Sequence, residues 1–298
     1  MTMFHCILLE RKNTLTKTYL IMISQFKALT SRYLFLFICL FLNSCSQVGS
    51  QFSGINMYST REELELGYQY SIELEKQLSI NYDSLLNQYI NSLGQRLVKS
   101  SNRNNIPYTF KIVNDRSINA FAIPGGYCYI NLGLIDLAES EAELASVISH
   151  EIAHVVGEHG MENMTKQQII GFAGAMILGA RPTFTEEIIS SIIQRGVLTN
   201  FSRGAELEAD RLGIQQMHAA GIDPIGFESF LKKMRDQEKG ENSQFSKMLS
   251  THPPTSLRIK KSIETRTSLS RKKYDSDDES FLNMKQHLNR NYKKSNRN

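Results

Sequence analysis

The feature that most constrains this chain is the pentapeptide HEIAH at positions 150–154. Apolar residues recur around it at helical spacing, and Ser140 followed by Glu143 is typical of a helix start. Because an α-helix has about 3.6 residues per turn, His150 and His154 project from one face. Two imidazoles placed in this way can bind one zinc ion, and Glu151 beside them is placed to take a proton from water. The pentapeptide therefore predicts a helix that carries a zinc site.

A third zinc ligand is expected downstream, because catalytic zinc usually takes three protein ligands and keeps one position for water. His159 is one candidate, but its spacing misses by one the pattern H-E-x-x-H-x-x-G-x-x-H. Glu206 is the other, in a helical segment where Asp210 follows four residues later on the same face. Glu206 could bind zinc while Asp210 accepts a hydrogen bond from the outer nitrogen of a ligand histidine. The alternative for this segment is an exposed acidic helix.

Four motifs follow one another between residues 60 and 265: NAFAIPGG at 119–126, HEIAH at 150–154, SRGAELEAD at 202–210 and THPPT at 251–255. In this combination the chain resembles the gluzincin zinc metallopeptidases of the HtpX, BepA and LoiP type, in the CAAX prenyl endopeptidase superfamily. The resemblance implies one zinc ion per chain, with Glu206 as its third ligand and Asp210 as the partner behind a ligand. In BepA-like members a histidine of the His-Pro motif can approach the zinc and keep the enzyme latent. His252 is therefore a candidate switch or, alternatively, a donor to the transition state.

Residues 1–44 are predicted to be a lipoprotein signal peptide. Lys27 and Arg32 precede an apolar run at 33–42 that is short for a membrane span but typical of a signal peptide. The Leu-Asn-Ser-Cys sequence that ends at Cys45 resembles a bacterial lipobox, which implies cleavage before Cys45 and lipid attachment to it. Residues 45–58 then read as a polar tether. The alternative is a buried helix with an incidental cysteine.

One zinc metallopeptidase domain is expected over residues 59–265, in the α+β class: mostly helical and zincin-like, with a small β-sheet before the HEIAH helix. Periodicity predicts two helices between 59 and 97, and strands at 108–113, 120–122 and 127–130. Strand 127–131 is either a peptide-binding edge or an interior strand. The apolar stretch 168–179 is too short to cross a bilayer and is either a buried helix or a mobile flap.

The charge of the chain is unevenly distributed. The net charge is +4, but basic residues concentrate in 1–44 and 266–298, which leaves the body between them acidic. This distribution disfavours a nucleic-acid-binding protein. Residues 266–298 are predicted to be a basic flexible tail. Cys128, the one cysteine beyond the lipobox, is expected to be a small core residue rather than a nucleophile.

The sequence therefore predicts a lipid-anchored zinc metalloendopeptidase of the bacterial cell envelope, held at the outer membrane and facing the periplasm. By resemblance to BepA and LoiP, its substrates are unfolded or misassembled envelope proteins, and its function is proteolytic quality control. The alternative is a latent protease that acts mainly as a periplasmic chaperone or adaptor. A structural zinc site is disfavoured because such sites usually have four protein ligands and favour cysteine.

Overall fold

A computed structural model of the chain describes residues 54–177, 201–238, 243–275 and 278–292. The described residues from Ile55 onward form one compact unit. The predicted signal peptide, Cys45 and most of the predicted tether lie outside the described residues. Among the helices in these ranges, none is both long enough and apolar enough to cross a membrane.

A four-stranded mixed sheet precedes the HEIAH helix, as predicted. Its strands are β1 (Ile80–Asn81), β2 (Thr109–Val113), β3 (Ala120–Ile123) and β4 (Tyr127–Asn131), in the spatial order β1-β2-β4-β3. Because β4 pairs in parallel with β2 and antiparallel with β3, the second of the two alternatives for 127–131, an interior strand, is confirmed, and the peptide-binding edge is excluded for this strand. Strand β4 also buries side chains on both faces of the sheet, and β3 forms the edge.

Helices cover both faces of this sheet. On one face, β2 and β4 contribute to the main core with α3 (Ser84–Lys99) and α5 (Glu141–Val156) through Phe110, Ile112, Cys128 and Ile130. On the other face, the sheet packs against α2 (Thr60–Glu75) and α6 (His159–Ile177) in a smaller cluster that includes Tyr70, Ile123, Tyr129, Met161 and Met164. The prediction of Cys128 as a core residue is confirmed, since its side chain is buried.

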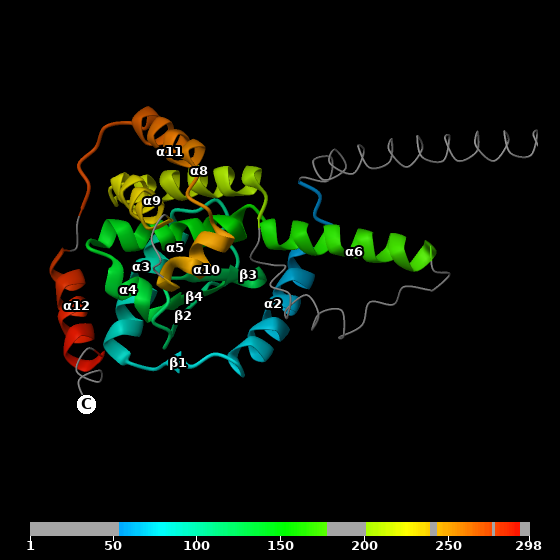
Figure 1. Cartoon of the computed structure of the whole chain (residues 1–298), viewed down its shortest axis with the longest axis horizontal. Helices are drawn as coiled ribbons and strands as arrows, with labels where there is room; N and C mark the ends of the chain where they lie inside the picture. Colours follow the sequence, from blue (N-terminus) through cyan, green and yellow to red (C-terminus); the bar gives the residue numbers. More distant parts are fainter. Residues whose placement is uncertain (1–53, 178–200, 239–242, 276–277, 293–298) are drawn as a thin grey trace, which may run out of the picture. The chain divides into compact units, whose positions relative to one another are not determined.

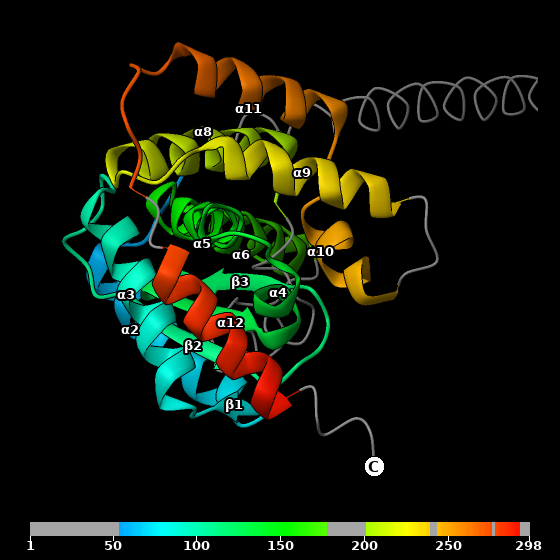
Figure 2. The same cartoon turned by 90° about the vertical axis from the view of Figure 1, so that its left-hand side faces the viewer.

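Helix α5 is the central element of the fold, and all its residues except Ala142 and Val156 are buried. Helices α8 (Arg203–Ala219) and α9 (Ile225–Glu238) pack on the side of α5 that faces away from the sheet. Helix α11 (Ser256–Ser268) lies over α8 and α9. The remaining short elements are α4 (Leu132–Leu137), η2 (Ser243–Phe245) and α10 (Ser246–Thr251). The layers seen in Figures 1 and 2 bring α5 and α8 face to face, which is where the candidate site lies.

The motif at 119–126 forms strand β3 and the tight turn η1 (Pro124–Gly126) that leads into β4. Gly125 and Gly126 have positive φ angles of 79° and 85°, a region that glycine adopts without steric cost. Helix α2 packs directly on this turn through Gly67, where an added Cβ would lie 2.1 Å from the Pro124 carbonyl oxygen. The glycines therefore allow the turn and α2 to approach closely beside α5.

The prediction of a flexible tail at 266–298 was wrong for most of its length. Helix α11 continues to Ser268, and α12 (Asp278–Tyr292) packs on α3 and α4 through Phe281, Met284 and Leu288, which are at most 3% exposed. The ammonium group of Lys285 also donates hydrogen bonds to carbonyls at the end of α4. These apolar residues stand at helical spacing, a signal hidden by the charged residues around them.

The last residues of the predicted tether belong to the folded unit. The backbone N–H of Met57 donates to Thr165 Oγ1 at 3.2 Å, and the Tyr58 hydroxyl donates to Gln168 Oε1 at 3.0 Å, so both residues are held against α6. Residues 168–177 continue α6, while the rest of the predicted helix or flap lies outside the described residues.

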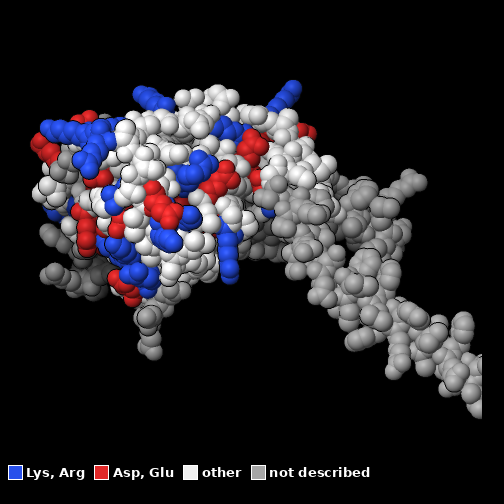
Figure 3. All heavy atoms as spheres, turned by 90° about the horizontal axis from the view of Figure 1, so that it is seen from above, with Lys and Arg blue, Asp and Glu red and all other residues white. Residues whose placement is uncertain are grey.

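The face shown in Figure 3 carries Lys and Arg interspersed with Asp and Glu. Ion pairs within single helices of the described chain include Lys261 with Glu264 on α11 and Lys232 with Glu228 on α9. This face therefore presents mixed charge rather than one extended patch of a single sign.

Candidate metal centre

Helix α5 places the HEIAH residues in the interior between the sheet and α8. Its N-cap is Ser140, whose hydroxyl accepts a hydrogen bond from the backbone N–H of Glu143 at 3.2 Å. The Glu143 carboxylate does not return this bond and instead accepts from the backbone N–H of Glu139. Past this cap the helix continues without interruption to Val156, so His150 and His154 lie on adjacent turns of one face.

Four side chains from three segments converge beside this face: His150 and His154 of α5, Glu206 of α8 and His252 after α10. The two Nε2 atoms of His150 and His154 are 3.0 Å apart. Glu206 Oε1 lies 3.3 Å from His154 Nε2 and 3.0 Å from His252 Nδ1. Each of the four side chains offers one ligand atom, all within 4.8 Å of one another, and all four residues are buried.

These residues fit a zinc ion. A tetrahedral zinc ion with bonds of about 2.0–2.2 Å separates its ligand atoms by about 3.3–3.6 Å. Five of the distances between the converging side-chain atoms are 3.0–3.5 Å. Imidazole nitrogens and carboxylate oxygens are ligands that zinc commonly takes. Several such electron-donating atoms packed around one point are stabilised by a cation between them.

Asp210 and Arg258 support the cluster from behind. Asp210 Oδ1 lies 3.1 Å from His150 Nδ1, the nitrogen that faces away from the cluster centre. The guanidinium of Arg258 forms a bidentate pair with Asp210, with both N–O distances 2.7 Å, and a third contact of 2.8 Å with Glu206 Oε2. Arg258 also donates to the carbonyl of Pro253, which follows His252. One arginine therefore joins the α8 carboxylates to the His252 segment.

Glu151 lies between the cluster and edge strand β3. Its Oε2 accepts a hydrogen bond of 3.0 Å from the backbone N–H of Ala122. Its Oε1 is buried, has no hydrogen-bond partner among the described residues and lies 3.7 Å from His252 Nε2. Burial raises the pKa of Glu151 above the usual range of a carboxyl group. Such a carboxylate can hold a proton more readily than one in water.

The electrostatics of the cluster favour a positive charge at its centre. Burial alone raises the pKa of Glu206, but the neighbouring imidazoles, chiefly His252, lower it well below its usual range. Burial alone lowers the pKa of His150, but the carboxylates of Asp210 and Glu206 raise it to about 9. Burial keeps the pKa of His154 well below its usual range, so His154 stays neutral. A neutral imidazole is the form that binds a metal.

Two side chains close the cluster in this structure. His252 fills the fourth position around the common centre, with its Nδ1 3.3 Å from His150 Nε2. Phe201, which precedes α8, stacks on the His154 ring with a centroid distance of 3.9 Å. Two cavities beside these residues measure about 20 and 10 Å³, room for at most one water molecule. A peptide can reach the cluster only if this covering moves.

His159, the weaker candidate for the third ligand, lies outside the cluster. Its Nδ1 is 2.8 Å from His154 Nδ1, on the far side of that ring from Glu206. Arg258 and Phe201 were not predicted from the sequence to be members of the site. The only available signal for Arg258 was its position just after the His-Pro motif, and Phe201 had none beyond its proximity to Glu206 in the sequence.

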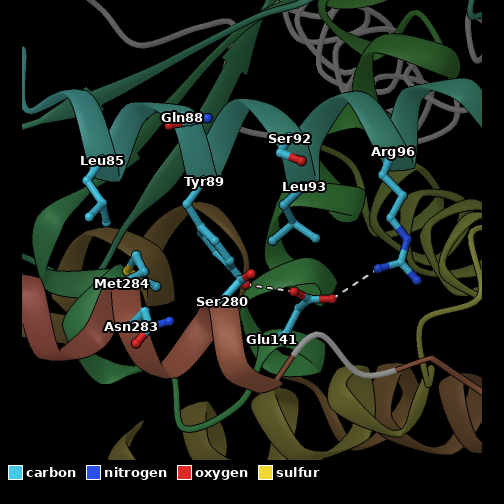
Figure 4. Close-up of a pocket in the computed structure, with 10 residues that line it drawn as sticks. All are labelled: Leu85, Gln88, Tyr89, Ser92, Leu93, Arg96, Glu141, Ser280, Asn283 and Met284. Carbon is cyan, nitrogen blue, oxygen red and sulfur yellow. Dashed lines mark hydrogen bonds and ion pairs between the residues drawn. The ribbon is translucent and has the colours of Figure 1, made fainter.

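A larger cavity lies at the opposite end of α5 from the metal cluster. It measures about 300 Å³, opens between α3 and α12, and is lined by residues that include Tyr89, Arg96, Glu141 and Met284. In Figure 4 the carboxylate of Glu141, the first residue of α5, accepts a hydrogen bond from Tyr89 and pairs with Arg96 at 3.2 Å. The cavity contains no residue of the cluster, so the candidate site is the closed centre rather than this open space.

The sequence of this chain is similar to those of known metallopeptidases. The sequence profile of peptidase family M48 matches residues 84–266, more than half of the chain and all four residues of the cluster. A beta-barrel assembly-enhancing protease of Yersinia pestis is 37% identical over 211 residues, which cover 67% of this chain and 43% of that protein. The protein of the same name from Escherichia coli K12 is 35% identical over 210 residues, again 67% and 43% of the two chains.

Similarity extends to eukaryotic proteins. The mitochondrial metalloendopeptidase OMA1 of Schizosaccharomyces pombe is 27% identical over 173 residues, which cover 58% of this chain and 51% of that protein. The chain thus spans about half the length of the curated relatives it matches. The region matched by the family model includes the α5 and α8 segments that supply the converging ligands.

Proposed function

Since the chain belongs to peptidase family M48 and carries the domain of a metallopeptidase, we propose that it is a zinc-dependent endopeptidase of unfolded or misassembled envelope proteins. The observation that carries this proposal is the convergence of His150, His154 and Glu206, with the Glu151 carboxylate beside them. The names of the bacterial relatives support a role in the cell envelope.

His150, His154 and Glu206 would hold the zinc ion, and Asp210 would fix the ring of His150 through its Nδ1. When bound, zinc would supply the Lewis acid that activates a water molecule and polarises the scissile carbonyl. Glu151 takes the proton of the attacking water on Oε1, the oxygen that has no hydrogen-bond partner in the described part of the chain. It then passes that proton to the amine that leaves. The raised pKa of Glu151 suits both transfers.

The outer edge of β3, which pairs with no further strand among the described residues, is the proposed binding surface for the substrate backbone. In an antiparallel pair, a residue directs its N–H and C=O to the same side. Because the N–H of Ala122 bonds to Glu151 rather than to β4, the carbonyl of Ala122 also points away from the sheet. An extended peptide added at this edge would run past Glu151 and the ligand cluster, held by backbone hydrogen bonds that do not depend on sequence. Such binding suits unfolded chains.

The closed arrangement supports a latent enzyme. His252 as a fourth ligand excludes water from the position that catalysis needs, and Phe201 covers His154. Activation would require the segment between α10 and α11 to withdraw His252. Arg258, which contacts Asp210, Glu206 and the Pro253 carbonyl, lies at the base of that segment.

The peptidase proposal is tested by casein hydrolysis with the full chain at matched zinc content. We expect wild-type hydrolysis to be slow, to disappear in Glu151→Gln, and to rise in His252→Ala if His252 only blocks the site. Zinc retained in Glu151→Gln would separate the loss of the base from the loss of the metal. Equal hydrolysis by wild type and Glu151→Gln would refute the assigned role of Glu151.

The closed cluster also favours a second function, that of a periplasmic chaperone or adaptor whose peptidase is mostly latent. Under this proposal the chain binds unfolded proteins and hydrolyses few of them. Suppression of the aggregation of a denatured outer-membrane protein by Glu151→Gln, at the same level as by wild type, would support it. Lack of suppression by either form would exclude it.

We further propose that a lipid on Cys45 anchors the chain to the outer membrane, facing the periplasm. The lipobox-like sequence before Cys45 supports this proposal. Metabolic labelling with a fatty acid should mark the wild type and leave Cys45→Ser unlabelled. Release of Cys45→Ser from the membrane fraction is expected, whereas an unchanged distribution would contradict the anchor.

A further inference from the structure

His159 is a buried histidine that the proposed reaction does not use. It is 3% exposed, and its Nδ1 lies 2.8 Å from His154 Nδ1. The other ring nitrogen of His154, Nε2, faces Glu206 and the cluster centre. We propose that His159 is a positioning residue that accepts a hydrogen bond from His154 Nδ1 and so keeps the Nε2 lone pair directed at zinc. This inference rests on the zinc site of the proposed function.

The hydrogen-bond partners select one arrangement of protons. A neutral imidazole carries a single N–H, and a ring that binds zinc through Nε2 must carry it on Nδ1. A contact of 2.8 Å between two Nδ1 atoms needs one donor and one acceptor, so His159 Nδ1 is the acceptor. The proton of His159 is then on Nε2, which faces Glu208 Oε2 at 3.6 Å. A carboxylate beside that N–H agrees with this arrangement.

The backbone turn between His154 and His159 brings the two rings together. Helix α5 ends at Gly157, and Glu158 follows with a φ angle of 55°, a left-handed conformation that a residue other than glycine rarely adopts. The turn brings the His159 ring against Gly157, where an added Cβ would lie 2.6 Å from His159 Nε2. Glu158 is held there by Arg103 at 3.1 Å and by Asn56 at 2.7 Å. A side chain five residues after His154 thus returns to its ring.

Each of the two ligand histidines of α5 therefore has its own partner behind it. Asp210 lies 3.1 Å from His150 Nδ1 and is balanced by Arg258, whereas His154 meets a neutral acceptor. A second carboxylate at that position would add negative charge to a centre that already holds Glu206 and Asp210. A neutral imidazole orients His154 without adding that charge.

The test is a competition titration of zinc against a chromophoric chelator, made on the full chain. His159→Asn places an amide oxygen near the position of Nδ1 and keeps the acceptor, while His159→Leu fills similar space without one. Loss of a hydrogen-bond partner behind a metal ligand typically weakens metal binding by about 10–100-fold, and we expect this for Leu. Asn should recover most of the loss. His218→Leu, which removes a histidine bonded to Tyr274 on the far part of α8, should bind zinc like wild type.

Two results would overturn the inference. If His159→Leu binds zinc as tightly as wild type, His154 needs no acceptor behind it. If Leu and Asn weaken binding equally, the ring of His159 acts by packing or by direct ligation rather than as an acceptor. Failure of the zinc site itself is distinguishable, because wild type would then bind no stoichiometric zinc or would bind it equally well as His150→Ala.

Discussion

Replacement of Arg258 by leucine is expected to destabilise the chain strongly when zinc is absent. Arg258 is 5% exposed, and its guanidinium makes three contacts of 2.7–2.8 Å with Asp210 and Glu206, both of which are at most 3% exposed. Removal of one partner of a buried ion pair typically costs about 3–5 kcal/mol, because the other charge remains buried without compensation. We expect a loss of this size in the free energy of unfolding.

Zinc should reduce this loss. A dication at the cluster centre would compensate Glu206 directly, which leaves Asp210 as the principal uncompensated group. The loss should then fall to about 1–3 kcal/mol, the cost of one buried group without its hydrogen bonds. Urea unfolding followed by circular dichroism, with and without zinc, measures both values.

The matched control is Arg235→Leu, because the Arg235 side chain is 43% exposed and pairs with Asp236 at 3.3 Å on the surface of α9. An exposed pair contributes about 0–1 kcal/mol, so this variant should be nearly neutral. A loss below about 1 kcal/mol for Arg258→Leu without zinc would refute the view that Arg258 neutralises the carboxylates of the site. Equal losses with and without zinc would refute the proposed position of the ion beside Glu206.

Three further predictions concern the fold. Met284→Ala should lower the free energy of unfolding by about 2–5 kcal/mol, because this fully buried side chain docks α12 on the core; a change near zero in urea unfolding would contradict that packing. Gly226→Ala should lower the free energy of unfolding by about 1–3 kcal/mol, because the added Cβ would lie 2.1 Å from a carbonyl oxygen of α5. The control is Gly204→Ala, where the nearest atom to an added Cβ is 3.7 Å away. In thermal unfolding this control should be neutral or stabilising. Burial alone raises the pKa of Asp83, but the hydrogen bond from His287 lowers it overall. The contribution of ionised Asp83 to the free energy of unfolding is therefore complete above about pH 4 and is lost as pH falls through the lowered pKa. Asp83→Asn should therefore lose less stability than the wild type when the pH is lowered into this range.

Helical periodicity accounts for what the sequence predicted well. It placed His150 and His154 on one face of α5, and Glu206 and Asp210 on one face of α8, because side chains four residues apart share a face. The structure brings these two faces together. The order of the sheet was less accessible, because it depends on pairing between β2 and β4 across residues that carry no local signal of it.

The parts that the sequence left open depend on long-range packing. Arg258 lies next to Asp210 only because α11 packs on α8, and neither segment alone shows that an arginine will be buried there. Helix α12 was misjudged because its apolar residues are few and lie in a charged segment, although α3 and α4 provide a surface for them. His159 shows the same limit, since its contact with His154 requires a left-handed turn at Glu158.

The most direct test of the proposed metal centre is zinc analysis and X-ray absorption on the purified full chain. The structure predicts one zinc ion per chain, ligated only by nitrogen and oxygen, with three imidazoles in the wild type and two in His252→Ala. This result would place the metal among His150, His154, Glu206 and His252 in the closed state. Sulfur in the first coordination shell, or the same number of imidazoles in both proteins, would contradict that arrangement.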